Sequence, residues 1–452
     1  MTVRVDTWFI ARLILLIIIA GEPSYVCAIE TSPDIIVIYT DDLGIGDVGA
    51  YGCEDIPTPH IDSIADNGVL CKQGYVTAPQ CGPSRAGLLT GRYQQKFGFE
   101  FNFPIKRSFE LGTPLSEMMI FSRMKKAGYR TGVVGKWHMG RGEGYCPWER
   151  DVDYFYGVLN GTSWYFPPFD WASKYLGLGD PTDIHRNDEV FIEKDSDYIT
   201  EAFARECTGF IKRNKNKPFF LYAPFTAPHV PILYRERHIS RVAHIEDKKR
   251  REYAALVVAL DDAVGRILDE LKEQGVWENT LLLFISDNGA SSHDGGSNAP
   301  FKGYKGSLWE GGIRVPYLVQ WPQKLPSGKI YEEAVSTLDV AATMVALAGQ
   351  DPAVPSLDGV NLIPFLTSEA SGAPHEFLFY KQFAWNDSWG IRHGNWMLMG
   401  RKEGERLLYN LSRDPSESEN LAMQYPELVD QLHGKWQQWN QTTEPVSWDW
   451  KE

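Results

Sequence analysis

The sequence has few cysteines and no excess of basic residues. Only 6 of its 452 residues are cysteine, which excludes a small scaffold built on disulfides. A chain of this length can bury enough surface to fold without such bridges. Its 45 Lys and Arg are outnumbered by 59 Asp and Glu, giving a net charge of −14. We therefore expect no nucleic-acid partner, although a local pocket can still be positive.

Long hydrophobic runs are also absent. The apolar run at residues 13–20 (LILLIIIA) follows Arg4 and Arg12, but it is too short to cross about 30 Å of hydrocarbon. This pattern is typical of a signal peptide over residues 1–28, with Val26-Cys27-Ala28 as the cleavage site. No later segment predicts a stable membrane span. We therefore expect an exported protein, periplasmic or extracellular, or lysosomal in a eukaryote.

Short apolar runs alternate with helical patterns along the chain. Strand-like runs lie at residues 35–39, 130–134, 219–223 and 281–285, and helical patterns at 84–91, 115–127, 198–213, 252–274 and 335–349. Nearly all-apolar strands separated by helices are typical of a mostly parallel sheet. The pattern predicts an α/β fold with a large, mostly parallel central sheet and helices on both of its faces.

A small α+β domain is expected at the carboxyl end. The Gly- and Ser-containing stretch 368–374 is typical of a linker. Strands are predicted at residues 377–380, 390–399 and 406–410, and a helix at 426–439. We therefore predict a large domain over residues 29–370 and a small domain with a short antiparallel sheet over residues 371–452.

Charged and polar side chains follow four of the predicted strands. Asp41 and Asp42 follow the first, Lys136 and His138 the second, His229 the third, and Asp287 and Asn288 the fourth. Each alone has an ordinary explanation, because Asp and Asn make turns and a single His is often structural. In open α/β sheets, however, ligands bind beyond the carboxyl ends of the strands. Four such groups at one edge favour a functional site.

A cluster of oxygen donors is expected within this site. Asp41, Asp42, Asp287 and Asn288 include no Cys or His pair at metal-binding spacing, so Ca²⁺ or Mg²⁺ is expected rather than Zn²⁺. Three carboxylates close together stay ionised only beside a cation. A divalent ion would also bind and polarise an anionic group of a substrate.

Residues 81–92 (CGPSRAGLLTGR) place a cysteine at the start of a helix. Pro83 suits the first helical turn, and Gly91 can end the helix. Cys81 would then lie where the helix dipole favours negative charge, with Arg85 one turn further on. The pattern predicts a reactive cysteine that faces a metal ion and an anion.

The same segment resembles the sulfatase signature C-x-P-S-R-A-x-L-L-T-G-R at every fixed position. The resemblance continues through residues 38–52, 128–140, 223–231, 284–290, 303–316 and 408–422. The chain thus resembles a type I sulfatase of the alkaline-phosphatase superfamily, similar to arylsulfatase A and N-acetylgalactosamine-6-sulfatase. The resemblance implies an alkaline-phosphatase-like fold and a sulfatase that hydrolyses sulfate esters.

The resemblance also implies how the nucleophile is made. A formylglycine-generating enzyme would oxidise Cys81 to formylglycine (3-oxoalanine), which fits the five cysteines left after the signal peptide. One hydroxyl of the hydrated aldehyde would attack sulfur. A calcium ion would be held by Asp41, Asp42, Asp287, Asn288 and residue 81. The pairing of the other cysteines, Cys53, Cys71, Cys146 and Cys207, stays open.

Further roles follow from the same resemblance. Arg85, Lys136 and Lys305 would stabilise the charge of the diol and of the sulfate. Lys136, His229 and Lys305 would bind the substrate, and His229 with Lys305 would protonate the leaving alcohol. His138 would take the proton of the remaining hydroxyl and so expel sulfate.

The substrate is less clear than the reaction. Residues 140–195 hold several aromatic side chains, including Trp164, Tyr165 and Trp171, which form either a rim for sugar rings or a locally packed loop. The rim favours a sulfated carbohydrate. Two alternatives remain: a formylglycine-dependent phosphate or phosphonate ester hydrolase of the same superfamily, and a catalytically inactive, secreted glycan-binding protein.

Overall fold

The computed structural model describes residues 32–161, 163–167, 184–191, 197–350, 357–446 and 448. The predicted signal peptide and Trp171 of the aromatic stretch lie outside the described residues. Pro33–Glu452 form one compact unit, and the domain boundary near residue 370 stays a prediction. Within the described ranges, no helix is long and apolar enough to cross a membrane.

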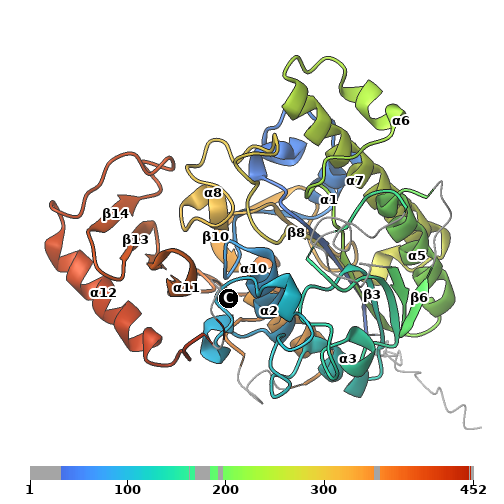
Figure 1. Ribbon diagram of the computed structural model, residues 1–452, viewed down its shortest axis with the longest axis horizontal. Coiled ribbons are helices and arrows are strands. Elements are labelled where there is room, and N and C mark those ends of the chain that lie inside the picture. The colour runs from blue at the N-terminus through green and yellow to red at the C-terminus, as the bar shows by residue number, and fades with distance from the viewer. Residues whose placement is uncertain are drawn as a thin grey trace, which may run out of the picture. The chain divides into compact units, whose positions relative to one another are not determined.

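A mixed sheet of ten strands forms the centre of the chain (Figure 1). Its order is β10-β2-β9-β8-β1-β7-β3-β4-β5-β6. The strands are β1 (Asp34–Thr40), β2 (Val69–Tyr75), β3 (Arg130–Lys136), β4 (Tyr154–Val158), β5 (Ile184–Arg186), β6 (Glu189–Phe191), β7 (Phe219–Pro224), β8 (Thr280–Ser286), β9 (Tyr317–Gln320) and β10 (Lys329–Ser336). The central strands β8, β1, β7, β3 and β4 are parallel, whereas β9, β5 and β6 run antiparallel to their neighbours. The predicted α/β fold with a mostly parallel sheet is confirmed.

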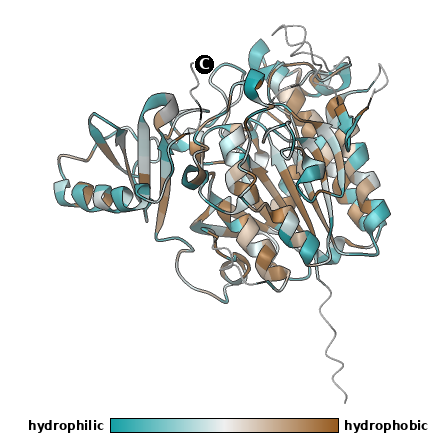
Figure 2. Cartoon of the chain, turned by 60° about the horizontal axis from the view of Figure 1, so that its bottom comes forward, coloured by the Kyte–Doolittle hydropathy of each residue, from teal (hydrophilic) through white to brown (hydrophobic). Residues whose placement is uncertain are grey.

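Helices cover both faces of this sheet because successive side chains of a strand point to opposite faces. Along β1, Ile35, Val37 and Tyr39 pack with side chains of α2, α3 and α9, whereas Ile36 and Ile38 pack with those of α1, α5 and α7. Figure 2 shows the hydrophobic strands between these helices. The bounds are α1 (Pro59–Asp66), α2 (Cys81–Thr90), α3 (Ile120–Lys126), α5 (Ile199–Asn214), α6 (Glu236–Ile239), α7 (Lys248–Glu273), α8 (Glu310–Ile313), α9 (Leu338–Leu347) and α10 (Ile363–Leu366).

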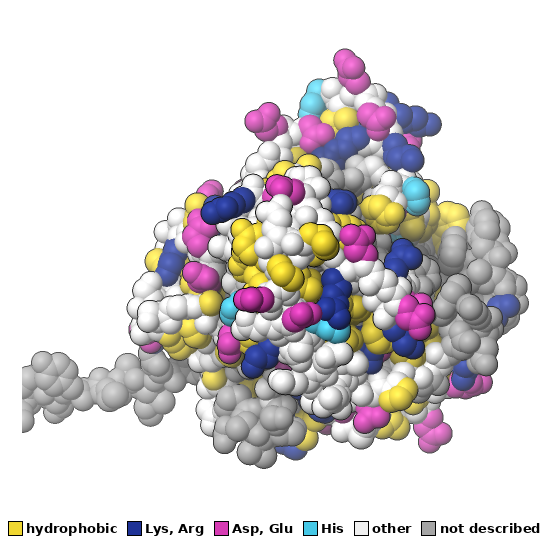
Figure 3. All heavy atoms as spheres, turned by 90° about the vertical axis from the view of Figure 1, so that its left-hand side faces the viewer, with side chains coloured by type: hydrophobic (Ala, Val, Ile, Leu, Met, Phe, Trp, Pro, Cys, Tyr) yellow, Lys and Arg dark blue, Asp and Glu magenta, His cyan; other side chains and the backbone are white. Residues whose placement is uncertain are grey.

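A second, antiparallel sheet lies near the carboxyl end, as predicted. Its strands, in order, are β11 (Phe377–Gln382), β12 (Ser388–His393), β13 (Trp396–Arg401) and β14 (Arg406–Asn410). The short helix α11 (Phe383–Asn386) joins β11 to β12, and α12 (Pro426–Asn440) packs on the sheet through Leu432 and Trp436. On the side of the molecule that faces the viewer in Figure 3, acidic and basic side chains are interspersed.

Several predicted elements have different bounds in the structure, and three of these differences have a clear structural cause. Residues 390–399 form two strands, because Gly394 turns the chain with a φ of +53°. Helix α3 begins at Ile120 rather than near residue 115, because Arg150 binds the carbonyls of Thr113 and Glu117. The segment before α9 belongs to β10, where Val335 pairs with β2.

The cysteines form no disulfide within the described part of the chain. Cys53, Cys71, Cys146 and Cys207 are free thiols, as is Cys81. Three of the first four are buried, and only Cys53 is partly exposed. The question of their pairing, which the sequence left open, is answered: none of them is bridged.

His375, at the start of the carboxyl-terminal segment, pairs with Asp339 of α9, a helix that packs on the large sheet. Its Nε2 lies 2.8 Å from Asp339 Oδ1, and Asp339 is fully buried at the start of α9. The same carboxylate accepts hydrogen bonds from the backbone N–H groups of Ser336 and Val360. Burial opposes a charged imidazole here, but the Asp339 carboxylate raises the pKa of His375 above its ordinary value of 6.5.

We expect His375→Gln to destabilise the protein more at pH 6 than at pH 9. A raised pKa in the folded state means that the charged pair contributes stability below pH 6.5, and that this contribution is lost as the pH rises through the raised pKa. The loss at pH 6 should be about 1–3 kcal/mol, measured as the free energy of unfolding in urea. An equal loss at both pH values would contradict the ion pair.

Candidate active site

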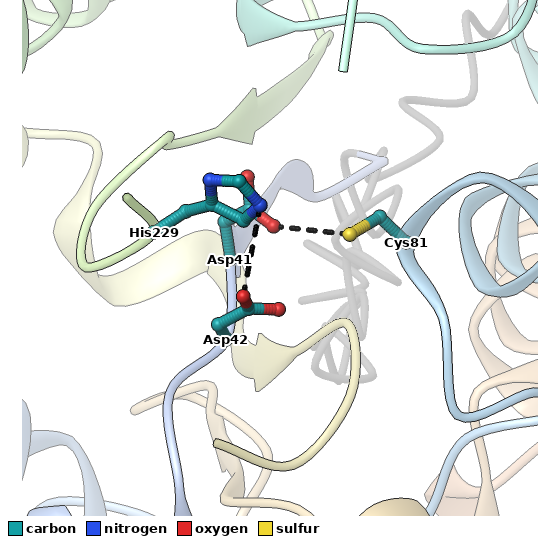
Figure 4. Close-up of side chains that lie close together, drawn as sticks. All are labelled: Asp41, Asp42, Cys81 and His229. Carbon is teal, nitrogen blue, oxygen red and sulfur yellow. Dashed lines mark hydrogen bonds and ion pairs between the residues drawn. The ribbon is translucent and has the colours of Figure 1, made fainter. Parts of the chain in front are cut away.

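Four neighbouring strands of the large sheet end at the same edge, and candidate residues follow each of them. β8, β1, β7 and β3 are consecutive and parallel. The last residues of β1 and β8 are paired, which brings Asp41 and Asp42 beside Asp287 and Asn288. Figure 4 shows how Asp41 and Asp42, after β1, approach His229 from the loop after β7 and Cys81 from the start of α2.

Three carboxylates are buried at this edge. Asp41, Asp42 and Asp287 each expose at most 2% of their surface. The backbone N–H of Asp42 donates to Asp287 Oδ1 over 3.2 Å, and Asn288 Nδ2 donates to Asp42 Oδ1 over 2.7 Å. Burial and the neighbouring Asp41 carboxylate raise the pKa of Asp287 above its usual range. Burial would also raise the pKa of Asp42, but the Lys305 charge lowers it below its usual range, so the three carboxylates depend on neighbouring cations to stay ionised.

The cluster fits a hard divalent cation. Asn288 Oδ1 is buried, and no group in the described ranges hydrogen-bonds to it. One ligand atom from each of Asp41, Asp42, Cys81 and His229 lies within 4.8 Å of the others. Carboxylate and amide oxygens are the ligands that Ca²⁺ and Mg²⁺ prefer. A divalent cation bound here would coordinate this amide oxygen together with the three carboxylates.

Three cationic side chains balance the three carboxylates. The pairs are Arg85 with Asp287 at 2.7 Å, Lys136 with Asp41 at 2.7 Å and Lys305 with Asp42 at 2.8 Å. A divalent ion would therefore leave the pocket with a net positive charge, which suits an anionic ligand. The side chains of Arg85 and Lys136 are fully buried, whereas 21% of the Lys305 side chain is exposed. Lys305 thus borders the open side of the site.

Cys81 occupies the first position of α2. Its Sγ donates to Asp41 Oδ1 over 3.3 Å, and only 1% of the residue is exposed. Burial raises the pKa of the Cys81 thiol above its usual range, and the Asp287 charge raises it further. An unmodified thiol at this position stays protonated at neutral pH and is a weak nucleophile.

His138 lies just beyond β3 in an uncommon backbone conformation. Its φ of +59° is in the left-handed region, which residues other than Gly rarely adopt. The ring meets Phe103 edge-on at a centroid distance of 5.8 Å. A Cβ on Gly161 would lie 2.5 Å from His138 Nε2, so a larger residue at position 161 would displace the ring. Burial lowers the pKa of His138, and Lys136 lowers it further, which keeps the imidazole neutral, as a proton acceptor must be.

His229 faces the carboxylates from the loop after β7. Its Nδ1 lies 2.7 Å from the Val230 carbonyl oxygen, which assigns the proton of the neutral ring to Nδ1. Its Nε2 lies 3.7 Å from Asp42 Oδ2. Burial lowers the pKa of His229 to about 4, and Lys305 also lowers it. The ring is neutral in this site, and a bound anion would raise its pKa.

Lys305 belongs to a loop that connects the site with the four-stranded sheet. The Gly306 N–H donates to the carbonyl of Pro79, two residues before Cys81, over 2.7 Å. The Gly306 carbonyl accepts hydrogen bonds from Gln382 Nε2 at 3.0 Å and Asn386 Nδ2 at 3.3 Å. The loop is therefore held from both sides.

Two buried tyrosines support the site in roles that the sequence did not predict. The Tyr165 hydroxyl donates to the carbonyls of Thr226 and His229, and so holds the loop that carries His229. The Tyr253 hydroxyl donates to the Asp42 carbonyl. Tyr165 lies in the aromatic stretch that we noted for substrate binding, but its 1% exposure makes it a supporting side chain. For Tyr253, the sequence predicted a position on a helix but no role in the site.

Comparisons with known proteins identify the family. The model described as "Sulfatase" matches residues 33–350, and that described as "N-sulphoglucosamine sulphohydrolase, C-terminal" matches residues 304–442. N-acetylgalactosamine-6-sulfatase of Sus scrofa is 30% identical over 466 residues, which cover 92% of this chain and 87% of that protein. Steryl-sulfatase of Mus musculus is 32% identical over 440 residues, which cover 80% of this chain and 70% of that protein.

Solved structures agree with this result. The crystal structure of Ps i-CgsB matches with a TM-score of 0.87 and 35% identity, over 93% of this chain and 95% of that one. A structure of Ps i-CgsB in complex with k-i-k-neocarrahexaose matches with a TM-score of 0.87 and 34% identity. Because the sulfatase model covers more than half of the sequence and the relatives span most of it, the chain belongs to the sulfatase family and is a sulfuric ester hydrolase.

Proposed function

We propose that this sulfatase is an exported, calcium-dependent enzyme that removes sulfate from a glycan, with a formylglycine made from Cys81 as its nucleophile. The similarity to Ps i-CgsB carries the glycan assignment, because that protein has been solved with the oligosaccharide k-i-k-neocarrahexaose. The three cations that converge on one buried edge support the binding of a sulfate group.

The nucleophile is proposed to be the hydrated aldehyde of residue 81. The raised pKa of the Cys81 thiol argues against a thiolate, whereas a diol hydroxyl can attack sulfur and form a covalent sulfate ester. The mass of the peptide that contains residue 81, from protein made in its native host, tests this step. An unmodified cysteine in active enzyme would contradict the proposal.

Calcium is proposed to bind Asp41, Asp42, Asp287, Asn288 and residue 81, where it would make the diol hydroxyl more acidic and polarise the sulfate. Arg85 and Lys136, both buried, would stabilise negative charge on the diol and the sulfate. Lys305, at the open side of the site, would contact the sulfate as it enters.

The two histidines are proposed to move protons at different steps. His229 Nε2 faces the site with Lys305 nearby, and the charge of a bound sulfate would raise its pKa so that it can protonate the leaving alcohol. His138, kept neutral by burial, would accept the proton of the second hydroxyl. Loss of that proton rebuilds the aldehyde and expels sulfate.

Free sulfate released from a panel of sulfated mono- and oligosaccharides tests the substrate class. We expect release from at least one oligosaccharide at a higher kcat/KM than from an aryl sulfate. Matched aryl sulfate and aryl phosphate esters provide the second comparison. Faster cleavage of the phosphate would favour the alternative phosphate or phosphonate ester hydrolase.

Trp164→Ala is expected to lower kcat/KM for a sulfated oligosaccharide about tenfold and to spare a small chromogenic ester. Trp164 is partly buried and precedes Tyr165, which holds the His229 loop; we propose that the exposed part of its ring meets a sugar beside the sulfate. A tenfold loss equals about 1.4 kcal/mol, the scale of one aromatic contact. Trp396→Ala, in the four-stranded sheet, serves as the control. Equal losses on both substrates would contradict a sugar-binding role for Trp164.

The proposal that the protein is exported rests only on the signal-peptide pattern of residues 1–28. Cleavage after Ala28 would give a mature chain that begins at Ile29. Amino-terminal sequencing of the secreted protein tests this, and an intact Met1 in that fraction would contradict it.

A further inference from the structure

The chain beyond α12 returns to the segment that follows α2. The Glu444 N–H donates to the Gln95 carbonyl over 2.9 Å, and Lys381 Nζ donates to Thr443 Oγ1 over 2.8 Å. Gly98 has a φ of +74°, and a Cβ there would lie 2.6 Å from the Pro445 carbonyl oxygen. This close backbone approach holds the tail, defined as residues 443–446 and 448, against residues 95–98.

Trp448 fixes the end of this tail in an aromatic cluster. Only 7% of Trp448 is exposed. Its ring centroid lies 5.2 Å from that of Phe99, 6.0 Å from that of Phe101 and 6.2 Å from that of Phe103. The cluster also includes Ala86 of α2. Trp448 is the largest side chain of the cluster, so its removal would leave the three phenylalanines without their common partner.

The segment that carries these phenylalanines contacts two parts of the active site. The Gly82 N–H, next to residue 81, donates to Asn102 Oδ1 over 2.8 Å, and the Phe99 ring lies 3.3 Å from where a Cβ of Gly82 would be. At its other end, Phe103 meets the His138 ring edge-on. Residues 99–103 thus adjoin both the start of α2 and the proposed proton acceptor.

We propose that Trp448 is a positioning residue of the active site, which acts through Phe103 on His138 and through Phe99 and Asn102 on the start of α2. This rests on the proposed roles of Cys81 and His138. The matched carboxyl-terminal model ends at residue 442, before Trp448. The physical reason is packing: aromatic rings in contact restrict one another's rotamers, and a small displacement of a reacting group costs much of its rate.

Full-length Trp448→Ala and Trp448→Phe variants test this inference, with Trp277→Ala as the matched control. Trp277 is a partly buried tryptophan just before β8, at the sheet edge opposite the site. We expect Trp448→Ala to lower kcat for an aryl sulfate about 10- to 100-fold with little change in KM. Trp448→Phe should recover most of kcat, and Trp277→Ala should leave it unchanged. Rates are normalised to the fraction of protein that carries formylglycine, measured by peptide mass.

A second readout does not depend on activity. Modification by diethyl pyrocarbonate, mapped by peptide mass, reports how accessible each histidine is. His138 is 8% exposed in the intact protein, and His238, 1% exposed and away from the tail, is the internal control. We expect Trp448→Ala to speed modification of His138 about fivefold or more and to leave His238 unchanged.

The outcomes separate the two proposals. An unchanged normalised kcat and an unchanged rate at His138 would overturn the positioning role. Equal acceleration at His138 and His238 would also overturn it, because it would show general loosening. If the wild type lacks formylglycine or releases no sulfate, the proposed function fails, yet the rate at His138 still tests whether Trp448 holds the ring.

Discussion

Cys81→Ala is expected to lower kcat/KM for an aryl sulfate at least about a thousandfold and to leave the protein folded. The side chain at position 81 is the proposed source of the covalent intermediate, and alanine supplies no atom that can attack sulfur. The change in volume is small, and Cys81 makes one hydrogen bond with Asp41. We therefore expect the thermal transition to move by only a few degrees.

Cys207→Ala is the matched control for this variant. Cys207 is also a buried, free thiol, but it lies on α5 in the core between helices and sheet. Its loss should reduce stability through a small cavity and leave kcat/KM within about twofold of the wild type. Substantial turnover by Cys81→Ala, above about one tenth of the wild-type rate, would show that the nucleophile lies elsewhere.

Removal of divalent cations is expected to abolish turnover and to lower the melting temperature. Asp41, Asp42 and Asp287 are buried together, and without an ion their mutual repulsion is offset only by the neighbouring basic groups. An ion at about 100 times its Kd stabilises the folded state by about 2.7 kcal/mol, which should appear as a shift of a few degrees. Activity and calorimetry after EDTA treatment, dialysis and readdition of Ca²⁺ measure both effects.

Asp42→Asn should reproduce much of this loss in the presence of Ca²⁺, with a decrease in kcat/KM of at least about a hundredfold. It removes one proposed ligand and leaves Lys305 without its partner. Asp339→Asn is the control, since Asp339 is also fully buried but binds the backbone N–H groups of Ser336 and Val360 near the start of α9. The control should lose stability and keep its response to Ca²⁺. Full activity after exhaustive chelation would disprove the metal site.

The candidate residues could be found from sequence because they follow apolar strands directly. The carboxyl ends of parallel strands lie at the same edge of a sheet. Residues that follow such strands, for example Asp42 and Asp287, are therefore expected to lie close together even when the exact strand pairing is unknown. Supporting residues give no such signal. Tyr165 and Asn102 act through hydrogen bonds to the backbone of the His229 loop and of Gly82. These bonds depend on the path of loops that the sequence pattern does not determine.

Some elements of the fold were also missed, because their apolar pattern is interrupted or depends on tertiary contacts. The central strands are buried on both faces and therefore read as continuous apolar runs. β2 (VLCKQGY) was missed because Lys72 is exposed and Gln73 partly exposed, which interrupts the run. The helix expected from residue 115 begins later because the Arg150 guanidinium binds the Glu117 carbonyl, which such a helix would use, and the Thr113 carbonyl just before it. The strands β4, β5, β6, β9 and β10 were not predicted either. Strand pairing and contacts such as those of Arg150 are tertiary interactions that local propensity does not include.

The loop around Gly306 limits how freely the two sheets could be recombined. The backbone of this single glycine bonds to Pro79 through its N–H and to Gln382 and Asn386 through its carbonyl. A chimera that joins the large sheet of this sulfatase to the carboxyl-terminal segment of a relative would have to recreate those bonds to keep Lys305 in place. The small sheet is therefore not an interchangeable module. A substitution at Gln382 or Asn386 would also disturb the loop that holds Lys305 near Cys81.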